Sequence, residues 1–260
     1  MAVNAKRQAK KHVATKKIID AKRVYYKDLN DLIHKALAEG AKEITLTNVN
    51  GQRYIGNGVK SKVKIVIEGV PGNDLAAFMD GPTLIIKSNA QDGVCNTMND
   101  GKVVIWGDAG DVLGYGMRGG KLFIKGNVGY RVGIHMKEYE NQIPVIIAGG
   151  CARDFLGEYM AGGIAILLGL GLGENDELVG DFVGTGMHGG IIFIRGKVDQ
   201  RTLGKEVAPF DLDDKDRQTL RKHLKEYCDE FGLDLKEIMK KEFTKLIPYS
   251  HRPYGNIYAY

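Results

Sequence analysis

The sequence predicts an all-β solenoid, a right-handed parallel β-helix of about six or seven coils with helical caps at its N- and C-terminal ends. Three observations lead to this prediction: a recurring glycine-rich phrase, a recurring methionine, and a short apolar run after most phrases. Repeats of about 20 residues are typical of solenoids, because a unit of that size buries its apolar face only by stacking on its neighbours.

The repeated phrase is clearest at 110–120, which reads GDVLGYGMRGG, and at 180–190, which reads GDFVGTGMHGG. A third copy spans 154–163. Apolar residues and a closing glycine follow each copy, which predicts a short strand, a glycine turn and a second short strand in every unit. No stretch between Gly69 and Gly196 has the 3.6-residue period of a crossover helix.

Methionine marks the repeat, because it recurs at steps of 19 residues and then, after insertions, at steps of 24 and 27. A small residue stands three positions before each methionine, and an aspartate stands six positions before several of them. The methionines are Met79, Met98, Met117, Met136, Met160 and Met187; the small residues are Ala76, Cys95, Gly114, Gly133, Gly157 and Gly184; the aspartates are Asp92, Asp111, Asp154 and Asp181. We expect the methionines to stack inward, and the small residues to lie at tight corners where φ is positive or coils approach closely.

Two segments match the dinucleotide-binding fingerprint GxGxxG, one beginning at Gly114 and one at Gly184. That fingerprint needs a helix after its glycines, so that the pyrophosphate meets the helix N-terminus. A run of three or four apolar residues that ends in glycine follows each match here. We therefore interpret these glycines as solenoid corners and not as a nucleotide site.

The chain divides into three predicted regions: a basic leader at 1–23, the β-helix at 24–208, and a C-terminal helical region with an aromatic tail at 209–260. Within the second region, a helix at 28–39 with Asp28 as its cap is expected to cover the open N-terminal end of the solenoid.

The C-terminal region is predicted to hold two helices. The first begins at Asp213 and ends at Gly232, and the second begins at Asp234 and ends before Pro248. The tyrosine-rich tail at 249–260 is expected to pack on this chain or on a partner, because tyrosine is an interface residue.

Composition narrows the class of function. The 260 residues include 35 glycines and 6 prolines, and the formal net charge is +5. The chain has no run of 18 apolar residues, no apolar stretch near Met1 and only three, widely spaced, cysteines, so we expect a cytoplasmic protein without a membrane partner. The leader could bind nucleic acid, but no aromatic residues interleave with its charges, which favours a solvated or partner-docked leader.

The aspartate column is the main candidate for a ligand site, because stacked carboxylates hold Ca²⁺ in β-rolls of about nine residues per repeat. This repeat is longer, so we interpret each aspartate as an Asx-turn that binds N–H groups of its own corner. His135, His188 and Arg118 stand on separate coils, and the sequence places no cysteine or aspartate in register with them as a metal site would need. We assign no catalytic, cofactor-binding or metal-binding residue to this chain, and we expect a scaffold.

The phrase at 110–120 resembles the GXGXG motif of the C-terminal β-helix domain of the glutamate synthase large (alpha) subunit. Further matches lie at 51–54, 157–163 and 243–248, and the resemblance covers about 18–248. The basic leader and the glycine-poor Met136 repeat depart from the family pattern.

The resemblance implies a free-standing, non-catalytic scaffold subunit of a glutamate synthase complex, which makes glutamate from glutamine and 2-oxoglutarate. It implies an amidotransferase subunit and a subunit with FMN and an iron–sulfur cluster as partners, and no cofactor in this chain. The scaffold subunit of formylmethanofuran dehydrogenase shares the repeat and is one alternative, and a carbohydrate-active β-helix is another. The oligomeric state stays open.

Overall fold

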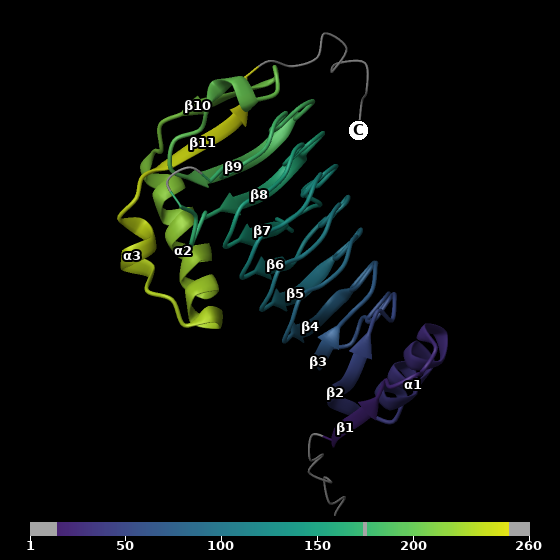
Figure 1. The fold of residues 1–260 in the computed structure, drawn as a ribbon. Coiled ribbons are helices and arrows are strands. Elements are labelled where there is room, and N and C mark those ends of the chain that lie inside the picture. The colour runs from purple at the N-terminus through teal and green to yellow at the C-terminus, as the bar shows by residue number, and fades with distance from the viewer. Residues whose placement is uncertain (1–14, 174–175, 250–260) are drawn as a thin grey trace, which may run out of the picture.

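The computed structural model of this chain describes residues 15–173 and 176–249, and it is a solenoid of about six turns (Figure 1). One sheet contains all eleven strands, in the order β1-β2-β3-β4-β5-β6-β7-β8-β9-β11-β10. The strands are β1 (Thr15–Asp20), β2 (Ala41–Asn50), β3 (Lys64–Val70), β4 (Asp80–Ile86), β5 (Asp100–Ile105), β6 (Lys121–Ile124), β7 (Val145–Ala148), β8 (Ala161–Leu167), β9 (Gly189–Arg195), β10 (Val207–Phe210) and β11 (Phe243–Pro248). The helices are α1 (Tyr26–Ala38), α2 (Asp214–Phe231), α3 (Leu235–Met239) and the short 3₁₀ helix η1 (Gln200–Thr202). The predicted all-β solenoid is confirmed.

Strands β1 to β9 are parallel, and each contributes one long side of a coil. Equivalent apolar residues pair from strand to strand, as Leu84 does with Val103 and Val103 with Leu122. All six repeat methionines are buried, with at most 1% of the side chain exposed. The predicted inward column of methionines is therefore confirmed, and it runs through one continuous core.

The glycine-turn segments form the side of each coil that faces the sheet across this core. All six small residues of the column have φ between 61° and 75°, including Ala76 and Cys95. A Cβ added at Gly114 would lie 2.5 Å from the Cδ1 atom of Ile146 in β7. Two physical reasons therefore require a small residue in this column. The backbone is left-handed there, and the core leaves little space for a larger side chain.

The N-terminal end differs from the prediction in two respects. The end of the leader predicted at 1–23 belongs to the sheet, because it forms β1; residues 1–14 lie outside the described residues. Helix α1 begins at Tyr26 after an N-cap, Tyr25, whose side chain makes no capping bond, and Asp28 lies in the first turn. An acidic residue there is favoured by the helix dipole, which explains why it resembles a cap in the sequence. Helix α1 still buries Leu29 and Ile33 in the core at this end.

Helix α2 begins and ends where the sequence predicts. Asp213 and Asp216 form a reciprocal capping box, and Gly232 closes the helix in the left-handed region. The helix does not cap the end of the solenoid, however. It lies along the outer face of the sheet, as Figure 1 shows, and buries Leu224 and Tyr227 against the sheet residues of a second apolar cluster.

The second predicted helix is much shorter than expected, because α3 ends at Met239 and the residues before and including Pro248 form β11. This strand pairs antiparallel with β9 and with β10, so strands and not helices close the C-terminal end of the sheet. The last coil offers an open edge, and Phe243 and Ile247 have the β propensity that suits a strand. The tail from 250 onward lies outside the described residues.

Candidate docking surface

The two fingerprint matches are corners of the solenoid, as predicted. Gly114, Gly116, Gly184 and Gly186 all have positive φ. The elements that follow them are the strands β6 and β9 and not helices. No helix N-terminus therefore follows these glycines, so they lack the geometry of a dinucleotide-binding site.

The aspartates of the column bind the next coil and not their own turn, which corrects the predicted Asx-turns. Oδ1 of Asp92 accepts the backbone N–H of Asp111 at 2.9 Å, and Oδ1 of Asp111 accepts that of Tyr130 at 2.9 Å. Oδ1 of Asp154 likewise accepts the N–H of Asp181 at 3.0 Å. We call this series the aspartate ladder. The aspartate ladder joins neighbouring coils at the glycine turns, whereas strand pairing joins them on the sheet side.

A glycine precedes each residue whose N–H the ladder binds, and it makes room for the carboxylate of the preceding coil. A Cβ on Gly110 would lie 2.0 Å from Oδ1 of Asp92, and one on Gly129 would lie 1.9 Å from Oδ1 of Asp111. The Gly-Asp pair is therefore one device, in which the aspartate supplies the acceptor and the glycine supplies the space.

A second ladder escaped the sequence reasoning. Oδ1 of Asn89 accepts the N–H of Asp108 at 2.9 Å, Oδ1 of Asp108 that of Asn127 at 2.7 Å, and Oδ1 of Asn127 that of Cys151 at 3.0 Å. Glycine precedes Asp108 and Asn127 in the sequence, so a Gly-Asp or Gly-Asn pair that recurs after 19 residues was the available signal.

The outward side of the glycine turns carries a stack of aromatic rings. We call this surface the turn face and define it as the outward side of 111–118, 130–137, 154–161 and 181–188. The rings of His135 and Tyr159 stack at 5.3 Å, and Tyr115 meets His135 edge-on at 5.7 Å. Phe155 and Phe182 stack at 5.0 Å. The sequence reasoning missed this surface, because it considered His135 only as a metal ligand or catalytic group.

Charged side chains also lie on the turn face. The guanidinium of Arg131 lies 4.5 Å over the ring of Phe155 and forms an ion pair with the buried Glu158. Arg118 and His188 occupy equivalent positions just after the repeat methionine, and the structure places them on different coils, as predicted. The aspartate ladder runs along the opposite flank of the same segments.

The outer face of the sheet is covered by α2 over β5 to β9. The hydroxyl of Tyr227 donates to the carbonyl oxygen of Ile124 at 2.9 Å, and its ring meets Phe123 at 5.7 Å. Lys102 and Lys121 form ion pairs with glutamates of α2. Trp106 meets Phe231 of α2 edge-on at 5.3 Å.

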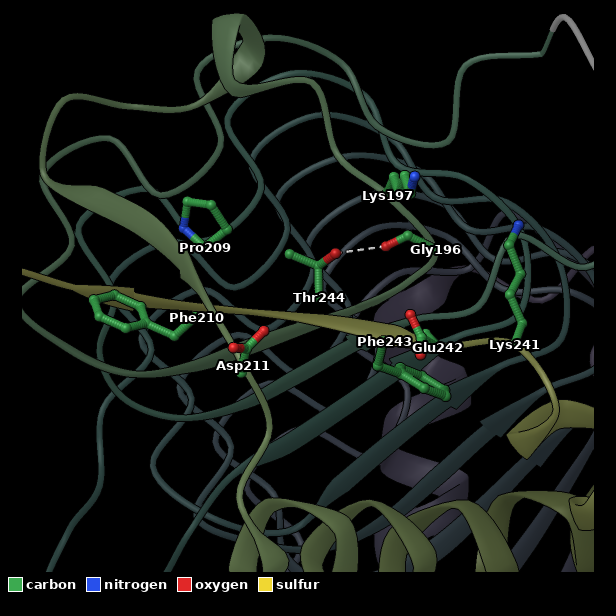
Figure 2. A pocket seen from close by; sticks show the side chains of 9 residues that line it. All are labelled: Gly196, Lys197, Pro209, Phe210, Asp211, Lys241, Glu242, Phe243 and Thr244. Atoms are coloured by element: carbon green, nitrogen blue, oxygen red, sulfur yellow. Dashed lines mark hydrogen bonds between the residues drawn. The ribbon is translucent and has the colours of Figure 1, made fainter.

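An open hollow lies beside β11 at the C-terminal end, with a volume of about 900 Å³. Figure 2 shows Lys197 and Lys241 on one side of it and Asp211 and Glu242 among the other lining residues. The hydroxyl of Thr244 donates to the carbonyl oxygen that follows β9 at 2.6 Å (Figure 2). The lining contains no histidine, cysteine or serine, so we assign no catalytic role to this hollow.

Among residues 15–173 and 176–249, no three histidine, cysteine, aspartate or glutamate side chains gather as metal ligands would. The helices in this part of the chain are all too short or too polar to cross a bilayer. The three cysteines are free, and burial raises the pKa of the Cys95 thiol well above its usual range.

Comparisons with known proteins agree with this description. The protein MJ1350 of Methanocaldococcus jannaschii is 46% identical over 250 residues, which cover 93% of this chain and 96% of that protein. Ferredoxin-dependent glutamate synthase 2 of Synechocystis is 30% identical over 166 residues, which cover 59% of this chain. The match spans only 10% of that much longer protein.

A solved structure, the formyltransferase/hydrolase complex of Methylorubrum extorquens with methylofuran, contains a chain with the same fold. The TM-score is 0.56 at 21% identity, and the match covers 84% of this chain and 85% of that one. The family model described as the GXGXG motif matches residues 28–249, which include the glycine turns, the aspartate ladder and the strands that they join. This chain therefore belongs to the GXGXG-motif family.

Proposed function

We propose that this chain is a non-catalytic scaffold subunit of a glutamate synthase-type complex. The observation that carries the proposal is the family match over 28–249, together with the similarity to a segment of ferredoxin-dependent glutamate synthase 2. MJ1350 is matched over 96% of its own length, which supports the idea that the segment also occurs as a separate chain.

The regular stack of strands and turns supports a scaffold (Figure 1). The carboxylates of Asp92, Asp111 and Asp154 are engaged in the ladder. They therefore do not provide the free carboxylate pair that a carbohydrate-active β-helix would use for acid and base catalysis. In the proposed complex, an amidotransferase subunit releases ammonia from glutamine, and a subunit with FMN and an iron–sulfur cluster uses it to form glutamate from 2-oxoglutarate.

A scaffold of the kind found in formylmethanofuran dehydrogenase is the second candidate. The solved chain of the formyltransferase/hydrolase complex favours it, because the fold match covers most of both chains. At 21% identity this likeness concerns the fold alone, so we rank this candidate second.

The test is affinity purification of the tagged chain from its native cells at physiological salt, with the co-purifying subunits identified by mass. We expect a flavin and iron–sulfur protein together with an amidotransferase chain. A molybdenum or tungsten protein in their place would select the second candidate. Recovery of the chain alone, or turnover of glutamine or 2-oxoglutarate by the purified chain alone, would refute the proposal.

A further inference from the structure

We propose that strand β1 pairs antiparallel with β1 of a second copy of this chain, around a two-fold axis at Ile18, so that the two sheets become one continuous sheet. The proposal concerns an edge of the sheet and stands independently of the enzyme complex proposed above. It rests on the backbone groups that β1 directs away from the sheet, on the register that they impose, and on the charges that this register brings together.

Strand β1 is the N-terminal edge of the sheet. It pairs with β2 and with no other strand in the described part of the chain, and Figure 1 shows it as the outermost strand at this end. Its side chains are exposed except that of Ile19, which is half-buried, and Ile18 is 77% exposed. A row of unpaired N–H and C=O groups on such an edge is a template for another strand.

The bonds to β2 determine which backbone groups face the open edge. The N–H of Ala21 donates to the carbonyl oxygen of Thr47 at 2.8 Å. In a parallel pair, alternate residues direct both N–H and C=O toward the neighbouring strand. Ala21 and every second residue before it therefore face β2. The residues between them direct both groups toward the open edge, and in β1 these are Lys16, Ile18 and Asp20.

These outward groups select one register for an antiparallel partner. A second β1 presents the same three residues, and a bonded pair requires an outward residue opposite an outward residue. When all three are used on both copies, Ile18 lies opposite Ile18 on the two-fold axis, and Lys16 lies opposite Asp20 of the second copy. A shift by one residue sets outward residues against inward ones. A shift by two leaves one of the three without a partner in β1.

The charges of the sheet agree with this register. Lys64 of β3, Glu43 of β2 and Lys16 are aligned across the sheet, and Nζ of Lys16 lies 3.0 Å from Oε1 of Glu43. Asp20 of the second copy continues this row, so that the charges alternate in sign from strand to strand. The two-fold axis forms the same pair again at the other end of β1. Opposite charges on facing strands stabilise their pairing, and this complementarity identifies the occupant as a second copy.

The centre of the pair is aliphatic. Ile18, Thr45 and Val66 are aligned across β1, β2 and β3, which gives the sheet a row of β-branched side chains. On the axis, Ile18 of one copy packs beside Ile18 of the other and extends this row. Cross-strand pairs of β-branched residues stabilise sheets, whereas a lone edge strand leaves this isoleucine in water.

The other edge of the sheet, β10, is unsuited to such pairing. The N–H of Tyr249 donates to the carbonyl oxygen of Glu206 at 3.0 Å, so Glu206 and every second residue after it face β11. Pro209 therefore lies at a position that faces outward, where it offers no N–H. Since one edge pairs and the other is blunted, association should end at the dimer.

The first experiment is sedimentation velocity of the full chain from about 2 to 400 µM, a range around the Kd of tens of micromolar expected for so small an interface. Lys16→Glu sets a glutamate opposite Asp20 of the other copy at both ends and should raise Kd about ten-fold. Lys64→Glu is the matched control, because Lys64 flanks Glu43 on its other side. It removes the same attraction within the chain and should leave Kd unchanged.

Two more variants test the register and the backbone. Asp20→Lys alone should weaken the dimer as Lys16→Glu does, and the double variant should recover most of the affinity, since it exchanges the signs of the pair. Ile18→Pro removes an N–H that faces the open edge and no bond to β2. It should abolish the dimer while circular dichroism and the melting temperature show a folded chain.

Oxidative crosslinking reports on the position of the axis. In the dimer, two cysteines from Ile18→Cys lie opposite each other with Cα atoms about 5.5 Å apart, which suits a disulfide. Two cysteines from Lys16→Cys lie about 13 Å apart along the strands and should stay reduced. The wild type, whose three cysteines are free, gives the background under the same oxidant.

Several results would overturn the proposal. They are a monomer at all concentrations, an equal response of Kd to Lys16→Glu and Lys64→Glu, or equal crosslinking of the two cysteine variants. A full chain that is monomeric but dimerises once residues 1–14 are removed would identify that segment as the occupant of the edge and would refute the proposal as well.

Discussion

Asp111 shows how a single side chain joins two coils. Its Oδ1 atom accepts an N–H from the next coil at 2.9 Å, and Gly129 on that coil has no side chain because the carboxylate fills the space. The column of small residues three positions before each methionine is set by a different constraint. Glycine, alanine or cysteine occurs there because the backbone is left-handed and faces the sheet across the core. Residue type in this fold is thus set by the contact with the neighbouring coil.

The aspartate ladder predicts different outcomes for two substitutions of Asp111. Asp111→Asn retains an oxygen acceptor, as Asn89 and Asn127 do in the second ladder, and should change the free energy of unfolding by less than about 0.5 kcal/mol. Asp111→Ala leaves the N–H of Tyr130 without this acceptor and should cost about 1–2 kcal/mol. Urea denaturation measures both values. Equal stability of the two variants would mean that the ladder bond contributes nothing.

The small column predicts a second contrast, between Gly114 and Gly58. Both have left-handed backbones, with φ of 67° and 64°, so alanine imposes a similar strain of about 1 kcal/mol on each. A Cβ at Gly114 also meets Ile146 at 2.5 Å, whereas none of the described atoms lies within 4 Å of a Cβ at Gly58. Gly114→Ala should therefore cost about 1–3 kcal/mol more than Gly58→Ala in the same urea assay. A difference near zero would show that the core adjusts freely there.

At the scale of elements, α2 and β11 determine how the C-terminal half is closed. The amphipathic pattern of α2 is readable, and so are its caps at Asp213 and Gly232. The surface against which α2 packs could not be predicted, because an apolar stripe fits the end of a solenoid as well as the outer face of its sheet. The outward residues Val104, Phe123 and Phe193 give the sheet an apolar face over these coils, and the helix packs there.

The position of His223 on α2 predicts a pH dependence of stability. Its Nδ1 is the one buried side-chain nitrogen or oxygen without a hydrogen-bond partner in the part of the chain that the structure describes. Burial, with Lys222 and Lys121 nearby, lowers the pKa of His223 to about 4, although Glu226 opposes this shift. The pKa of this histidine in the unfolded chain is about 6.5, so between that pH and about 4 the imidazole is protonated in the unfolded chain and neutral in the folded chain. The full free energy of unfolding is therefore reached only above about pH 6.5.

Stability should therefore fall as the pH decreases from about 6.5 to 4, by roughly 1–2 kcal/mol after allowance for solvent screening. The measurement is urea denaturation across this range for the wild type and for His223→Gln, which lacks the titrating group. All other ionisable groups are the same in the two proteins, so their contributions cancel in the comparison. Parallel pH profiles for the two proteins would contradict the assignment.

At the scale of the whole molecule, the solenoid is a stack of nearly equivalent coils held by contacts between neighbours. Strand pairing joins them on one side, and the two ladders with the left-handed turns join them on the other. Stability is then close to a sum over coils and their interfaces. A coil that lies outside the area covered by α2 should be removable as a unit.

Removal of residues 74–92, a complete 19-residue repeat, should leave a folded protein. The deletion joins Asn73 to Gly93, which keeps the register of the turns, and takes away β4 with one set of inward residues. We expect a cooperative unfolding transition and a loss of a few kcal/mol. Deletion of 74–83 removes about half a coil, breaks the register and should abolish folding. Circular dichroism and thermal melts distinguish the two, and equal behaviour of the deletions would refute a modular solenoid.

From the sequence alone we could predict the repeat, the inward methionine and small-residue columns, and the strand-and-turn character of each unit. These features are periodic, and a periodic pattern is visible along a chain because each coil meets the same surroundings. The caps of α2 were also readable, since a capping box and a C-terminal glycine act within a few residues.

The contacts between distant parts of the chain could not be predicted from the sequence. The aspartates were assigned to their own turns, but they bind the next coil 19 residues or more away, and a single sequence does not show which distant N–H is nearest. Residues 243–248 continue a helical pattern in the sequence, yet they become β11 because the last coil offers an open strand edge. The stack of rings on the turn face likewise exists only when coils from 111 to 188 lie in register, since residues far apart in the chain form one surface through that stacking.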